Sequence, residues 1–146
     1  MKETTKLNIR QIMDILEDGN LGYEKLASQF EQYDVSTVFK RLSQQRKMFI
    51  EELKYECLVQ GETLMVTGTM AGFFHRTLMG LKEAFASEES LIEMAVDGEK
   101  AAIKAYQENM NENIPRFLKE KLEQQLDLIK GAIPQLQNFK QEVGES

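Results

Sequence analysis

The scarcity of helix-breaking residues is the feature that most constrains this fold. Proline occurs only at Pro115 and Pro134, and the glycines are few and isolated. Between these residues, apolar side chains recur at steps of three and four, which places them on one face of an α-helix. The sequence therefore predicts an all-α protein built from long amphipathic helices.

The first half of the chain contains two such helices. One is predicted over residues 5–32, and the second begins after Ser36, a good N-cap, and stops near Gly61. Because the break between them is short, they form an antiparallel hairpin. The predicted core positions are Ile9, Ile12, Leu16, Gly19, Tyr23, Leu26, Phe30 and Tyr33, then Phe39, Leu42, Gln45, Phe49, Leu53 and Cys57.

The second half contains another pair of long helices. Ser87 is the expected N-cap of the third helix, residues 111–113 break it, and Pro115 suits the first turn of the fourth. We expect Pro134 to bend or interrupt that last helix. The predicted core positions are Leu91, Met94, Ala95, Gly98, Ala102, Ala105 and Tyr106, then Leu118, Leu122, Gln125, Ile129, Ala132, Leu136 and Phe139.

The two hairpins are joined by a long connection at about residues 61–87. Residues 61–67 read as a loop, and a shorter, glycine-containing helix is predicted over residues 70–86. The order hairpin, crossover, hairpin is typical of a ferritin-like four-helix bundle. A chain of 146 residues fits one such domain, 1–146.

Several strings in this order resemble a known family. They are LEDGNLGYEKLA, SQQRKMFIEEL, AGFFHRTLMGLKEAF and EMAVDGEKAAIKAY. The chain, from about Leu7 to Phe139, is similar to an uncharacterised bacterial family of ferritin-like four-helix bundle proteins catalogued as a domain of unknown function. The resemblance implies the bundle fold and self-association, and it implies no reaction, because the family has none established.

Composition excludes several classes of function. The net charge of -6 repels phosphate backbones, so a nucleic-acid partner is disfavoured. No apolar run is long enough for a membrane span, and the first residues lack the apolar region of a signal peptide. We therefore expect a cytoplasmic protein without membrane or nucleic-acid partners.

A di-iron centre of the ferritin type needs two glutamates and two Glu-x-x-His pairs. The chain has one histidine and no Glu-x-x-His, so we expect no cofactor. The alternative is an atypical carboxylate-rich site for iron or another divalent metal. Its candidate ligands are Glu99, Asp127, Glu52 and Asp18. The simpler interpretation of Glu99 is a charged residue at the edge of the apolar stripe, partnered by a lysine or a tyrosine.

Two glutamines fall on apolar stripes, which predicts a buried polar network. Gln45 and Gln125 would lose free energy if buried without partners, so they should bond to each other or to a tyrosine. Tyr23 and Tyr106 lie at comparable depths and could complete the network. Both tyrosines could equally be amphipathic aromatics at the edge of the core.

The potential catalytic side chains lack supporting groups. His75 is either a general base or switch, or a structural histidine bonded to a bundle carboxylate, and we favour the structural role. Cys57 lies on an apolar stripe, where a free cysteine acts as a small buried hydrophobe. We therefore expect no catalytic residues.

Two surfaces are candidates for interaction. The crossover carries more apolar groups than one covered face requires, and this candidate surface is Phe73, Phe74, His75, Arg76, Leu78 and Met79. The second helix has a basic run, Lys40, Arg41, Arg46 and Lys47, which is either a solvated face or a site for an acidic partner. These features predict a non-enzymatic structural or interaction protein that forms a homodimer or larger oligomer and binds a protein partner, with a metal-binding bundle as the alternative.

Overall fold

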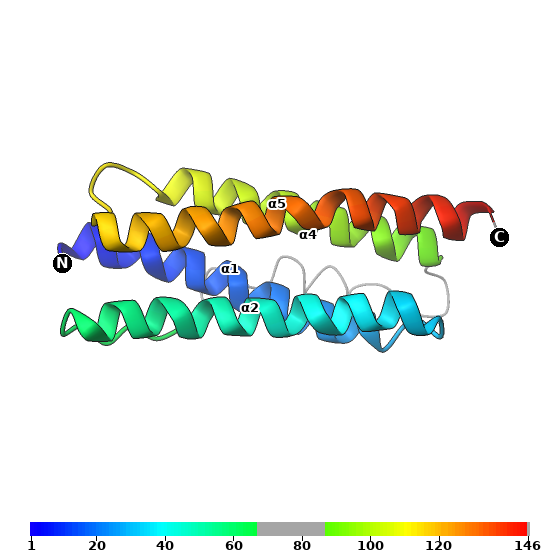
Figure 1. The fold of residues 1–146 in the computed structure, drawn as a ribbon, viewed down its shortest axis with the longest axis horizontal. Coiled ribbons are helices and arrows are strands. Elements are labelled where there is room, and N and C mark those ends of the chain that lie inside the picture. The colour runs from blue at the N-terminus through cyan, green and yellow to red at the C-terminus, as the bar shows by residue number, and fades with distance from the viewer. Residues whose placement is uncertain (67–86, 146) are drawn as a thin grey trace.

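The chain folds into a bundle of long helices. A computed structural model describes residues 1–66 and 87–145, which contain four helices and no strand (Figure 1). The helices are α1 (Glu3–Ala27), α2 (Tyr33–Val59), α4 (Glu88–Asn109) and α5 (Arg116–Glu145). The predicted all-α four-helix bundle is thereby confirmed. The short helix predicted over residues 70–86 lies outside the described residues.

The helices form two antiparallel hairpins. In Figure 1, α1 and α2 run in opposite directions, and so do α4 and α5, whereas α2 and α4 run in the same direction. Helix α1 packs on α2 and α4, and α5 packs on α4 and α2. Because α2 ends at one end of the bundle and α4 begins at the other, the arrangement agrees with the expected hairpin, crossover, hairpin order. None of the described helices combines the length and apolar character needed to cross a membrane.

The apolar core is divided into two clusters along the bundle axis. One cluster contains Phe39, Ile92 and Leu136, and the other contains Leu53 and Leu122. On α2 and α4 the division falls at interior positions occupied by charged side chains. The middle of the bundle is therefore polar, and both ends are apolar.

The turn between α1 and α2 differs from the expectation. Helix α1 ends at Ala27, and α2 begins at Tyr33, before Ser36. Ser36 is therefore not an N-cap, and its hydroxyl donates to the Ala27 carbonyl at 2.9 Å. Tyr33 was predicted in the core but is 84% exposed. The turn residue Phe30 is buried and falls on the same three-to-four spacing, so the apolar pattern continued past the real end of the helix.

Three other residues were predicted to begin, end or interrupt a helix. Ser87 caps α4 as predicted, since its hydroxyl accepts from the backbone N–H of Ser90 at 3.0 Å. Gly61 follows α2 with a φ of 80°, which glycine adopts at little cost. The interruption expected at Pro134 was wrong, because α5 continues through it. Pro134 is exposed, so water can bond the carbonyl left free one turn earlier.

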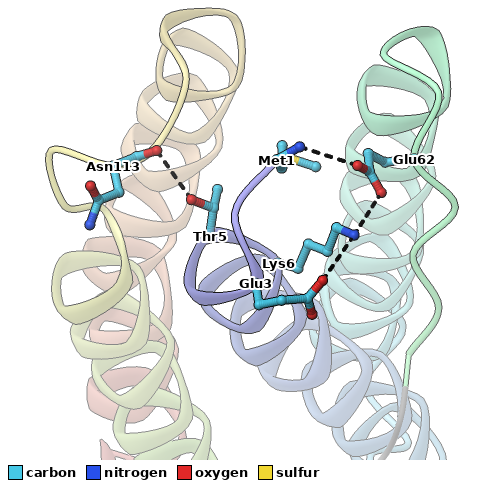
Figure 2. A network of polar contacts seen from close by, with 6 residues as sticks. All are labelled: Met1, Glu3, Thr5, Lys6, Glu62 and Asn113. Atoms are coloured by element: carbon cyan, nitrogen blue, oxygen red, sulfur yellow. Dashed lines mark hydrogen bonds and ion pairs between the residues drawn. The ribbon is translucent and has the colours of Figure 1, made fainter.

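Polar contacts join three segments at the end of the bundle where α1 begins (Figure 2). The Met1 amino group and the Lys6 ammonium lie 3.2 Å and 3.1 Å from the Glu62 carboxylate, in the loop after α2. The Thr5 hydroxyl donates to the carbonyl of Asn113, in the turn before α5. These contacts hold the start of α1 against the loop after α2 and against the turn before α5.

The charges of this network shift the pKa values of its members. Hydrogen bonds from Lys6 and from the Met1 amine hold the pKa of Glu62 below its ordinary value of 4.5. Hydrogen bonds to Glu62 and Glu3 raise the pKa of Lys6. A carboxyl whose pKa is lower in the folded state stabilises the fold above its unfolded pKa, and this contribution disappears as the pH falls through the folded pKa.

We expect Glu62→Gln to lower the free energy of unfolding at pH 7 in low salt. The difference from the wild-type protein should shrink to zero as the pH falls below the folded pKa of Glu62, because both side chains are then neutral. Urea denaturation at a series of pH values measures both effects. Glu120→Gln is the control, since Glu120 pairs with Arg116 on an exposed helix face and should change stability less. A difference that is equally large at pH 3 would contradict the role assigned to the Glu62 charge.

Candidate functional site

A buried ion pair lies in the middle of the bundle. Arg46 of α2 and Glu99 of α4 are each 1% exposed, and the Nη2 group of Arg46 donates to Oε1 of Glu99. Removing two charges from water is costly, so such a pair persists only where attraction and hydrogen bonds offset the lost hydration. The surrounding core must therefore supply hydrogen bonds to both charged groups.

Tyr23 of α1 is the third member of this cluster. Its hydroxyl donates to Oε1 of Glu99 and lies 3.3 Å from the Ala95 carbonyl. The guanidinium of Arg46 lies over the Tyr23 ring, 5.5 Å from the centroid, which is cation–π geometry. The same ring stacks on Phe39, with centroids 5.8 Å apart. One tyrosine thus joins the ion pair to the apolar cluster beside it.

The remaining contacts of Arg46 explain two neighbouring residues. A Cβ atom at Gly19 would lie 3.2 Å from Cγ of Arg46, so the glycine leaves room for the arginine side chain. Gln45 accepts a hydrogen bond from Nη1 of Arg46. Among the described residues, Oε2 of Glu99 is buried and has no hydrogen-bond partner.

Burial and charge fix the protonation of this cluster. Burial lowers the pKa of Arg46, but the charge and hydrogen bond of Glu99 together with the nearby Tyr23 and Tyr106 more than offset it, so the pKa lies above its ordinary value. Burial, reinforced by the charge of Glu99, raises the pKa of Tyr23 well above its ordinary value. Arg46 therefore stays charged at neutral pH, and Tyr23 stays a hydrogen-bond donor. The cluster is suited to holding helices together rather than to proton transfer.

A second polar chain leads from the core to the surface. Tyr106 donates to Oε1 of Gln125 at 2.8 Å, and Nε2 of Gln125 donates to the Phe49 carbonyl at 3.2 Å. Nε2 also lies 3.4 Å from Oε1 of Glu52, whose other oxygen accepts from Lys121 at 3.3 Å. These bonds satisfy the buried amide of Gln125 and connect α2, α4 and α5.

The four residues predicted to form one buried network belong to two separate groups. Gln125 and Tyr106 bond to each other, whereas Tyr23 and Gln45 contact the ion pair. Gln45 is only half-buried, because the next residue, Arg46, occupies the core position.

Two expectations about charged residues were wrong. Arg46 was placed on the exposed basic face of the second helix, yet it is buried. Glu99 was placed at the edge of its stripe, yet it lies in the core; the tyrosine partner expected for it is present as Tyr23, and Arg46 is a second partner. The signal for both was present in the spacing: each residue follows a buried apolar residue by four positions and precedes another by three.

The four candidate metal ligands are not arranged as a metal site. Asp127 is exposed, Glu52 pairs with Lys121, and Asp18 is buried on α1. Glu99 already has the positive charge of Arg46 beside it. No group of three or more histidine, cysteine or carboxylate side chains in residues 1–66 and 87–145 could hold a metal ion. The described residues do not fit a di-iron centre, and His75 lies outside them.

Cys57 is a free, fully buried cysteine of α2. Burial, with smaller contributions from the charges of Glu62 and Glu56, raises the pKa of its thiol to about 11. Little thiolate exists at neutral pH, and the thiolate is the nucleophilic form. The environment of Cys57 is therefore that of a core residue.

The outer face of α2 exposes large apolar side chains. We call this surface the α2 patch; it consists of Met48 (53% exposed), Tyr55 (64%), Leu58 (61%), Val59 (60%) and Met65 of the following loop (68%). A groove of about 480 Å³ lies between the end of α2 and this loop. It is lined by Glu51, Lys54, Tyr55, Leu58, Glu62, Thr63, Leu64 and Met65.

The other half of the same face is basic. Lys40, Arg41 and Lys47 are exposed, and no acidic residue occurs from 35 to 50. The outer face of α2 therefore changes from basic to apolar along its length. The crossover surface of Phe73, Phe74, His75, Arg76, Leu78 and Met79 lies outside the described residues.

The ion pair generates a stability prediction. Arg46→Met and Glu99→Met should each lower the free energy of unfolding by about 3–5 kcal/mol, because each leaves one charge buried without its partner. The double variant should lose much less than the sum of the two, since no unpaired charge remains. Urea denaturation of the four proteins gives the coupling energy.

The exposed pair Arg116 and Glu120 provides the matched control, with side chains 92% and 67% exposed. Its coupling energy should be below about 1 kcal/mol. Additive effects of Arg46→Met and Glu99→Met would contradict a coupled buried pair.

Comparison with known proteins identifies a family. Residues 4–112 match the family described as "Domain of unknown function (DUF2383)", a match that includes α1, α2 and α4 but ends before α5 and before Phe139. Neither the curated proteins nor the solved structures include a match to this chain. Since the match covers more than half of the chain, the protein belongs to the DUF2383 family of unknown function.

Proposed function

We propose that this protein is a non-enzymatic interaction protein, a helical scaffold that binds another protein chain through the outer face of α2. The observation that carries this proposal is the α2 patch. It exposes five large apolar side chains beside a groove, at one end of a charged bundle. Several large apolar side chains exposed on one helix face are typical of protein interaction sites.

The polar centre of the bundle supports a scaffold role. Buried polar contacts between helices can fix their register and rotation, because any other arrangement leaves charged groups unpaired. Arg46 and Glu99 join α2 to α4, and Gln125 joins α5 to both. These contacts favour one orientation of α2, and with it one outer surface.

The charge of the surface indicates what kind of chain it would bind. The basic half of the face, with Lys40, Arg41 and Lys47, favours acidic groups in the partner. The α2 patch favours apolar side chains. The complementary surface therefore carries apolar and acidic groups in separate zones. The single cysteine, which allows no disulfide within the chain, supports a cytoplasmic location.

Photo-crosslinking in cells tests the proposal. We expect a benzophenone amino acid at position 55, in place of Tyr55, to form defined adducts with a protein chain, because Tyr55 is central to the α2 patch. The same probe in place of Leu128, an exposed apolar residue of α5 outside the patch, should form none. Denaturing electrophoresis and mass spectrometry identify the adducts. Equal labelling at 55 and 128, or none at either, would contradict the proposed surface.

The alternative function is a metal-binding bundle with an atypical carboxylate site. The observation in its favour is the buried Oε2 of Glu99, which has no hydrogen-bond partner among the described residues. We rank this alternative second, because Arg46 already supplies a positive charge to the same carboxylate.

Metal content distinguishes the two functions. We expect untagged protein to retain no stoichiometric metal by mass spectrometry, before or after exposure to ferrous iron under anaerobic conditions. Arg46 should prevent a divalent ion from approaching Glu99, so the Glu99→Gln variant should give the same result. Near-stoichiometric metal that is lost in Glu99→Gln would instead favour the metal-binding function.

A further inference from the structure

We draw no further inference here: the strongest candidate, the groove between α1 and α2 that Lys40 and Lys47 line, is an exposed polar surface, and nothing in the residues that the structure describes shows what covers it.

Discussion

The buried pair of Arg46 and Glu99 is the interaction on which the rest of this bundle depends. It lies between two apolar clusters, so both clusters can pack only if the two charges are paired and hydrogen-bonded. Tyr23 supplies a hydrogen bond and a ring face, and Gly19 supplies the space for the arginine. The identities of residues on three helices follow from keeping two charges in a core.

The spacing of apolar residues predicted the helices, because each helix buries one face. Residues that favour helix ends, such as N-capping serine and glycine, lie near their ends. Ser87 and Gly61 are examples in which a single side chain or backbone conformation determines the end of a helix. The turn after Ala27 was missed because Phe30 is buried outside a helix. A pattern of burial cannot distinguish a turn residue packed on the core from a helical one.

The candidate site was harder to predict, because it depends on contacts between distant residues. The general rule that charged residues are exposed placed Arg46 in solvent and Glu99 at an edge. The spacing was compatible with Gln45 and Gly98 as well as with their neighbours Arg46 and Glu99, and only the opposite charges of the latter two indicated that they pair in the core. The α2 patch was missed because the sequence pattern was used to assign one apolar face to each helix. Helix α2 buries one apolar face in the core and also exposes apolar side chains on its outer face.

The ion pair and the outer face of α2 are linked through the rotation of this helix. Successive residues are 100° apart around a helix, so placing Gln45 rather than Arg46 at the core position would rotate the whole helix by that angle. Met48, Tyr55 and Leu58 would then turn away from their present direction, and the inner aromatic residues would leave the core. The attraction between Arg46 and Glu99 opposes this rotation. The charge pair inside the bundle therefore determines which side chains α2 presents outside it.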